Sequence, residues 1–323
     1  MTSSDRPALG ILLICLGVTA ISVNDMLIKL LSGGYPLHQI VFVRSAVGLI
    51  FSFALLRYEG GLRLLRTSTP LLHLLRGLLV VGANMTFYAA VAVMPLAQAT
   101  ALFFVAPLFI TLLAIPLLGE KVGPLRLGAV LVGFAGVAVM QRPWEGGDAG
   151  LGPVLLLPVA AALLYASMQV LTRRLGVTTR ASALAVYIQM TFLLVSLGFF
   201  LVAGDGRFAP GPENESLNFL LRAWILPPVS DWPVFAAIGL AAGGIGYCLS
   251  AAYRLADAAT IAPFEYIGLP LAIFWGWAIF GEWPDPVVWL GCALIVGAGL
   301  FVFLREQQKG RPLPGRRNRP FRR

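Results

Sequence analysis

The sequence predicts an all-α membrane protein in which ten transmembrane helices form two inverted five-helix repeats, with the N- and C-termini in the cytoplasm. Three observations predict this fold class: the composition, the spacing of apolar segments and an internal repeat. Of the 323 residues, 58% are hydrophobic and only 12% are charged, whereas a soluble domain has about 25% charged residues. The mean hydropathy of +0.83 places the chain among integral membrane proteins.

Apolar segments long enough to cross a hydrocarbon core of about 30 Å alternate with short connections that contain Gly and Pro. Only one connection, residues 204–232, is long. It contains the stretch SLNFLLRAWIL, which we expect to lie along the membrane interface as an amphipathic helix. The ten expected spans are 8–31, 37–57, 71–93, 97–118, 124–141, 151–174, 181–203, 233–254, 259–280 and 285–304.

The distribution of Lys and Arg predicts the orientation, because cytoplasmic connections of membrane proteins are rich in both residues. With the N-terminus in the cytoplasm, the outer connections contain only Arg142, Arg207 and Arg222, and they collect acidic residues instead. The long loop, 204–232, is then periplasmic. The basic tail, 305–323, is expected in the cytoplasm, where it contacts anionic membrane lipids rather than nucleic acid.

The two halves of the chain resemble each other. The segments that begin at Ala99 and Ala259 both open with Ala-Thr and both continue to a Gly-Glu pair, a proline and a Gly-rich helix. Earlier in each half, NDMLIKLL (24–31) aligns with MQVLTRRL (168–175). A repeat of five spans forces its second copy to enter the membrane from the opposite side, as in many secondary transporters. The expected units are a first repeat over 1–142, a second over 143–304 and the tail over 305–323.

These features together resemble the drug/metabolite transporter superfamily, EamA type, over nearly the whole chain from about Leu9 to Leu304. Within it, NDMLIKLL, HLLRGLL (73–79) and FGEWPD (280–285) are similar to a branch that includes S-adenosylmethionine and riboflavin carriers. The resemblance implies a carrier of a small organic metabolite (amino-acid-like, nucleoside-like or flavin-like) in the bacterial inner membrane. It also implies transport without ATP hydrolysis, and the sequence has no GxxxxGK[ST] loop.

Polar side chains within the apolar segments are the candidate substrate ligands, because an ionisable group inside a membrane is costly and usually functional. Ser22, Asp25 and Lys29 share one face of the first segment, and the repeat alignment places Gln169 opposite Asp25. We expect these polar faces to line a central cavity. The candidate substrate-binding residues are Asn24, Asp25, Arg44, Asn84, Tyr88, Tyr165, Gln169, Tyr247, Glu265 and Tyr266.

The charged members of this set have structural alternatives. Asp25 can pair with Lys29 one turn away, or with Arg44 of the second segment, as a clamp. Lys29 can either line the cavity or extend to the membrane interface. Glu265 has no basic residue one turn away in its own segment. It therefore pairs with a cation from another helix or carries a proton, and the second state suits a proton as the coupling ion.

Other residues carry weaker signals. Glu120 and Glu282, in the two Gly-Glu turns, are expected to be helix-terminus residues rather than ligands. The Gly-rich fifth and tenth segments are candidates for a scaffold or a homodimer face. The cysteines, Cys15, Cys248 and Cys292, have no CxxC or Cys/His spacing, so no metal and no cofactor are expected.

Two other classes of function are alternatives to a carrier. A membrane enzyme acting on a lipid-linked substrate needs a catalytic cluster at one interface, but the only two histidines, His38 and His73, fall on opposite membrane faces. A channel favours a continuous polar lining, whereas the polar residues here are concentrated in a few segments; a non-transporting sensor has no need of an inverted repeat. The repeat therefore favours a secondary transporter that works by alternating access.

Overall fold

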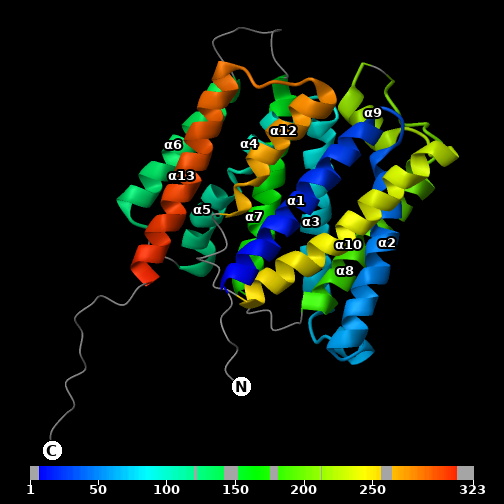
Figure 1. Cartoon of the computed structure of the whole chain (residues 1–323), viewed down its shortest axis with the longest axis horizontal. Helices are drawn as coiled ribbons and strands as arrows, with labels where there is room; N and C mark the ends of the chain where they lie inside the picture. The colour runs from blue at the N-terminus through cyan, green and yellow to red at the C-terminus, as the bar shows by residue number, and fades with distance from the viewer. Residues whose placement is uncertain are drawn as a thin grey trace, which may run out of the picture.

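The structure, a computed structural model, is a bundle of helices that run between two ends of the molecule (Figure 1). The first residue of α1 and the last of α13 lie at one end, and α9 lies at the other, which we call the α9 end. The helices are α1 (Pro7–Ser32), α2 (Leu37–Glu59), α3 (Pro70–Val91), α4 (Leu96–Phe103), α5 (Ala106–Leu118), α6 (Pro124–Gln141), α7 (Leu156–Arg174), α8 (Ala181–Ala203), α9 (Glu215–Leu221), α10 (Trp232–Leu255), α12 (Gly268–Phe280) and α13 (Pro286–Gly310).

Eight segments of the described chain are helical, long and apolar enough to cross a membrane, so this is a multi-pass membrane protein. The pair α4 and α5 counts as one of them, and α7 and α12 are apolar but shorter. The described residues contain no strand. The expected repeat boundary at residue 142 and the tail beyond residue 310 lie outside them. The structure describes residues 7–119, 122–141, 152–174, 181–211, 213–255 and 264–310.

Helical structure is interrupted twice in the middle of the bundle. The expected span 97–118 is not one continuous helix, because a turn at 104–105 separates α4 from α5. A second turn, at 266–267, precedes α12. Proline accounts for both, since it has no N–H to donate to the carbonyl four residues earlier and its ring clashes with that carbonyl. Pro107 follows the first turn and Pro270 the second.

The two interruptions lie against each other. The ring centroids of Phe104 and Tyr266, one from each turn, are 5.1 Å apart. Gly268 begins α12 at this point, and a Cβ there would lie 3.4 Å from both Phe104 Cζ and Val18 Cγ1. Helices α4 and α12 therefore meet where each departs from regular helical structure.

The half-helices α5 and α12 end in the same way. Gly119 follows α5 with φ 70°, and Gly281 follows α12 with φ 66°. Glycine is favoured here because its missing Cβ makes the left-handed conformation accessible. Glu282 comes next, and its backbone N–H donates to the Gly276 carbonyl at 2.8 Å. The turn thus folds Glu282 back over the end of α12; Glu120 lies outside the described residues.

Glycines allow helices to approach closely within this chain. Helix α6 packs on α13, and a Cβ at Gly291 would lie 2.2 Å from Met140 Cγ. Helix α10 packs on α2, and a Cβ at Gly239 would lie 2.6 Å from Val47 Cβ. The Gly-rich segments expected to form a scaffold or a dimer face therefore pack against each other in one molecule.

Gly291→Val is expected to lower the free energy of unfolding by about 1–3 kcal/mol, because the added side chain overlaps Met140 and separates α6 from α13. Gly297→Val on the same helix is the matched control, since a Cβ there has nothing within 4 Å. Thermal unfolding in detergent measures both. Equal melting temperatures for the two variants would contradict the close packing of α6 on α13.

The segment around α9 lies on the protein. Ser216 donates to the Ala89 carbonyl of α3 at 2.7 Å, and Phe219 is 1% exposed. Gln39 of α2 bonds both backbone groups of Ile225, donating to the carbonyl at 2.6 Å and accepting from the N–H at 3.2 Å. The stretch expected as an amphipathic helix along the membrane is instead a short helix docked on α2 and α3, because its apolar and backbone polar groups find partners there.

A tyrosine joins the loop after α1 to the beginning of α10 at the α9 end. The Tyr35 hydroxyl donates to Asp231 Oδ2 at 2.5 Å, and its ring meets the Phe235 ring edge-on at 5.0 Å. Burial and the neighbouring carboxylate raise the pKa of Tyr35 to about 12. The hydroxyl therefore keeps its proton and remains a donor throughout the physiological pH range.

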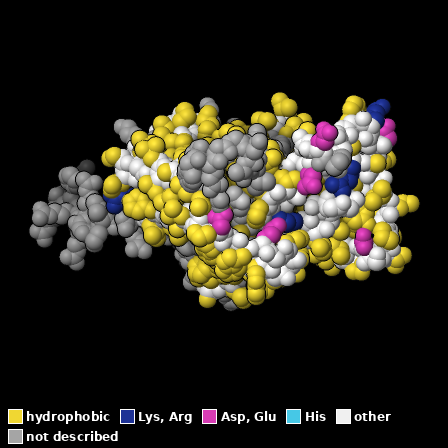
Figure 2. Space-filling model, turned by 90° about the horizontal axis from the view of Figure 1, so that it is seen from above, with side chains coloured by type: hydrophobic (Ala, Val, Ile, Leu, Met, Phe, Trp, Pro, Cys, Tyr) yellow, Lys and Arg dark blue, Asp and Glu magenta, His cyan; other side chains and the backbone are white. Residues whose placement is uncertain are grey.

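Acidic and basic residues are unevenly distributed between the two ends. Figure 2, seen from above relative to Figure 1, shows carboxylates together with some Lys and Arg side chains on the α9 end, with hydrophobic side chains around them. The described acids near the ends of helices there are Asp205, Glu213, Glu215, Asp231, Glu282 and Asp285. The arginines near the opposite end are Arg57, Arg63, Arg66, Arg76, Arg126 and Arg305.

Candidate functional site

A buried polar cluster joins α1 to α3. The Tyr88 hydroxyl donates to Asp25 Oδ1 at 2.6 Å, and Asn24 Nδ2 lies 2.8 Å from the Tyr88 oxygen and 3.2 Å from Asp25 Oδ1. Asn24 is 3% exposed and Tyr88 2%. The Asn24 carbonyl oxygen is buried without a hydrogen-bond partner in the described structure. Asn24, Asp25 and Tyr88 therefore form one hydrogen-bonded cluster in which the Asn24 carbonyl oxygen can still accept a hydrogen bond.

Arg44 lies close to this cluster and carries its positive charge on α2. Its guanidinium donates to Asn84 Oδ1 at 3.2 Å and stacks over the Phe192 ring, 5.0 Å from the centroid. The side chain is 7% exposed, and its charge attracts the Asp25 carboxylate. The expected clamp between Asp25 and Arg44 is therefore an attraction at longer range, with each group bonded to other side chains.

Aromatic side chains connect this cluster to α7. The ring centroids of Tyr88 and Phe87 are 5.4 Å apart, those of Phe87 and Phe103 are 5.4 Å apart, and those of Phe103 and Tyr165 are 5.6 Å apart. Gln169 donates to the Tyr165 hydroxyl at 2.8 Å. A row of four rings therefore runs from the Asp25 cluster to a second polar pair.

Glu265 and Tyr266 lie at the turn before α12. The Glu265 carboxylate is close enough for its charge to act on the hydroxyls of Tyr165 and Tyr266. Tyr266 extends toward α13, since a Cβ at Gly299 would lie 2.1 Å from its hydroxyl oxygen. The carboxylate thus lies near the α7 end of the aromatic row.

Tyr247 is not brought into this group. Its side chain on α10 is 56% exposed and has none of the hydrogen bonds or ring contacts found among the other described candidates. Of the ten candidate residues, the described structure therefore connects nine by hydrogen bonds, ring contacts or electrostatic interactions and leaves one apart.

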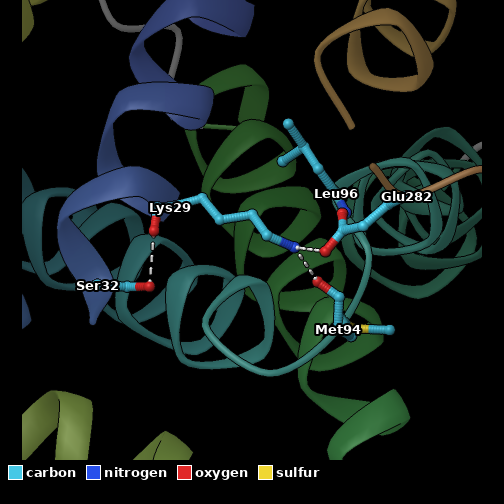
Figure 3. Close-up of polar contacts among 5 residues, drawn as sticks. All are labelled: Lys29, Ser32, Met94, Leu96 and Glu282. Carbon is cyan, nitrogen blue, oxygen red and sulfur yellow. Dashed lines mark hydrogen bonds and ion pairs between the residues drawn. The ribbon is translucent and has the colours of Figure 1, made fainter. Parts of the chain in front are cut away.

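Lys29 and Glu282 form an ion pair at the α9 end that the sequence did not indicate (Figure 3). Lys29 Nζ donates to Glu282 Oε1 at 2.6 Å and to the Met94 carbonyl at 2.7 Å. The other carboxylate oxygen accepts from the Leu96 N–H at 3.2 Å, at the start of α4. A carboxylate is favoured there by the partial positive charge of a helix N-terminus. The alternative in which Asp25 pairs with Lys29 is therefore not formed, and the Lys29 ammonium bonds Met94 and Glu282 instead.

Comparison with known proteins agrees with this architecture. The chain matches the EamA-like transporter family over residues 8–142. A riboflavin transporter of Rhizobium johnstonii is 32% identical over 308 residues, which is 95% of this chain and 94% of that protein. The riboflavin transporter of Vibrio cholerae serotype O1 is 30% identical and covers 86% of both chains. The S-adenosylmethionine uptake transporter of Rickettsia prowazekii is 25% identical, over 93% of this chain and 94% of that protein.

The class is that of multi-pass membrane proteins similar to transporters of small molecules. The chain belongs to the EamA-like transporter family of the drug/metabolite transporter superfamily, as its sequence motifs predict. One solved crystal structure shares the fold, with a TM-score of 0.59 over 95% of this chain and 100% of its own at 21% identity.

Proposed function

We propose that this protein is a secondary transporter that moves a small organic metabolite across the bacterial inner membrane by alternating access. The observation that carries the proposal is the meeting of two interrupted helices beside a buried polar cluster. Irregular backbone inside a membrane is tolerated where it is covered by protein or lines a cavity, and in transporters it marks the binding site. Membership of a transporter family supports the same function.

Flavin-like molecules are the substrates that we favour over amino-acid-like and nucleoside-like ones. Phe103 and Tyr165, the half-buried rings of the row, offer aromatic surface to a flat ring system. Hydrogen-bonding groups at both ends of the row, Asp25 with Asn24 and Tyr165 with Gln169, suit a hydroxylated chain. The relatives from Rhizobium johnstonii and Vibrio cholerae, named riboflavin transporters, support this preference.

The proposed orientation places the α9 end in the periplasm and both termini in the cytoplasm. The arginines near the end opposite α9, and the acids near the α9 end, support it, because basic residues are retained on the cytoplasmic side. A cysteine placed at Gly34, where a Cβ has nothing within 4 Å, should react with an impermeant thiol reagent added to intact spheroplasts.

Transport by purified protein in liposomes tests the function. Labelled riboflavin is added outside, and its accumulation is followed against liposomes without protein. Saturable uptake that unlabelled riboflavin blocks, and that S-adenosylmethionine does not, is expected. Uptake of S-adenosylmethionine alone would assign the protein to the second group of relatives, and no movement of either compound in either direction would overturn the flavin proposal.

Protons are the coupling ion that we propose, with Glu265 as the group that carries them. An inward proton gradient of one pH unit is expected to raise the steady-state accumulation of substrate by wild-type protein up to about tenfold, since a driving force of about 60 mV corresponds to a factor of about ten in the concentration ratio. Glu265→Gln is expected to lose this response and to keep downhill exchange. Glu215→Gln, an exposed glutamate of α9, is the control that keeps it. An unchanged response in Glu265→Gln would exclude Glu265 as the coupling group.

A further inference from the structure

We infer that the ion pair between Lys29 and Glu282 is a latch that holds the α9 end closed and breaks each time this end opens. The inference rests on the proposed alternating-access transport and adds a residue pair that acts at the entrance rather than at the substrate. It follows from which segments the pair joins, how exposed it is and how α12 is bounded.

The pair joins three separate segments at the α9 end. Lys29 lies in the last turn of α1, Met94 between α3 and α4, and Glu282 immediately after α12. Through one ammonium and one carboxylate, these segments share three hydrogen bonds (Figure 3). Since α1 and α12 belong to the two different sequence repeats, the pair closes the boundary between the halves that alternating access must open.

Its burial suits a contact that forms and breaks. The Lys29 side chain is 9% exposed and that of Glu282 25%. A fully buried pair costs much to separate because each charge is left without water, whereas an exposed pair contributes little. Here the carboxylate keeps access to solvent, so both charges can be hydrated as soon as α1 and α12 move apart. The Phe280 ring, 5.1 Å from Lys29 Nζ, adds a cation–π contact only in the closed arrangement.

Helix α12 is built to move as one piece. The turn at 266–267 separates the first residue of α12 from the segment before it, and Gly281, in the left-handed conformation, ends the helix. A short helix bounded by a turn at each end can tilt with small changes of backbone angle in the two turns. Glu282 lies just beyond the last residue of α12, so a small tilt of the helix about its first residue moves Glu282 farther from Lys29 than any residue within the helix.

Distances between spin labels test the latch directly. Labels are attached at Gly34→Cys, in the loop after α1, and at Trp283→Cys, 65% exposed beside Glu282, with the three natural cysteines replaced. Wild-type protein in lipid without substrate is expected to show mainly one short distance. Lys29→Gln and Glu282→Gln are each expected to increase the longer-distance population about fivefold, and Lys29→Arg is expected to restore the wild-type distribution.

The matched control is an ion pair at the same end that joins no helices. Asp205 and Arg207 approach to 3.7 Å, with side chains 63% and 58% exposed, so Asp205→Asn should leave the distances unchanged. If Lys29→Gln and Glu282→Gln also leave them unchanged, the pair is not a latch. The distances are measured without substrate, so they test the latch independently of the flavin proposal. If the latch variants shift the distances but no protein takes up flavin, the latch is retained and the flavin proposal is rejected. If flavin is taken up but the distances do not shift, only the latch is rejected.

Discussion

Asp25→Asn is expected to lower the transport rate at limiting substrate concentration by about 10- to 100-fold, because hydrogen bonds to a charged group contribute roughly 1.5–3 kcal/mol each. The carboxylate accepts from Tyr88 at 2.6 Å and from Asn24 at 3.2 Å. Both donors bond the same oxygen, Oδ1, and an amide oxygen accepts more weakly than a carboxylate oxygen, while the amide N–H₂ group takes the place of the second carboxylate oxygen. The substituted cluster therefore binds a polar substrate in a different geometry. Uptake into liposomes measures the effect.

Asp205→Asn provides the control for that variant, since it removes a carboxylate that is 63% exposed in the long loop. Size-exclusion profiles of both variants should match that of the wild type, and Asp205→Asn should melt within a few degrees of it. A variant Asp25→Asn that transports normally but unfolds at a much lower temperature would assign Asp25 a structural role and remove it from the substrate site.

Arg44→Gln is expected to lower the free energy of unfolding by about 1–3 kcal/mol, because the hydrogen bond to Asn84 and the cation–π contact with Phe192 are lost. The Asp25 charge also loses the attraction of Arg44. Combining Arg44→Gln with Asp25→Asn is therefore expected to cost at least about 0.5 kcal/mol less than the sum of the single changes. Denaturation in mixed micelles of the four proteins in this cycle measures the coupling.

Arg57→Gln, at the exposed end of the same helix, serves as the uncoupled reference. Its effect should add to that of Asp25→Asn within about 0.5 kcal/mol. If Arg44→Gln adds to Asp25→Asn equally well, the two charges do not neutralise each other. Arg44 would then be available to an anionic or carbonyl group of the substrate, and its loss should appear in transport rather than in stability.

The positions of most helices could be predicted because the membrane constrains the sequence strongly. A segment that must satisfy its backbone internally and face lipid has to be long and apolar. The first span was expected at 8–31 and α1 is Pro7–Ser32; the second was expected at 37–57 and α2 is Leu37–Glu59. Turn residues such as Gly33 and Gly34 end these segments, so their limits could be predicted to within two residues.

The interruption between α4 and α5 could not be predicted from hydropathy, because the sequence is apolar on both sides of the turn at 104–105. Pro107 directly follows the first turn, and Pro263 and Pro270 flank the second in the sequence. The docking of α9 was missed for a similar reason. An amphipathic stretch has the same pattern whether its apolar face meets lipid or protein, and the choice depends on partners such as Ala89 and Gln39 that are distant in sequence.

The residues of the candidate site could be predicted from the sequence, but not which of them bond to each other. Asn24, Asp25 and Tyr88 were all expected in the centre, yet nothing in the sequence shows that Tyr88 rather than Lys29 bonds Asp25. Lys29 and Glu282 are 253 residues apart. The repeat was the one available signal for this ion pair. The alignment of 24–31 with 168–175 places a basic residue at the position of Lys29 in both halves, and each half also has a Gly-Glu pair.

The two hydrogen bonds between Gln39 and Ile225 bear on where a substrate would enter in the transport cycle proposed above. Because one side chain of α2 holds both backbone groups of Ile225, the long loop is fastened to α2. Entry between the loop and α2 would have to break both bonds at once. In the proposed cycle, a portal at this end would therefore open away from this contact, between α1 and α12, next to Lys29 and Glu282.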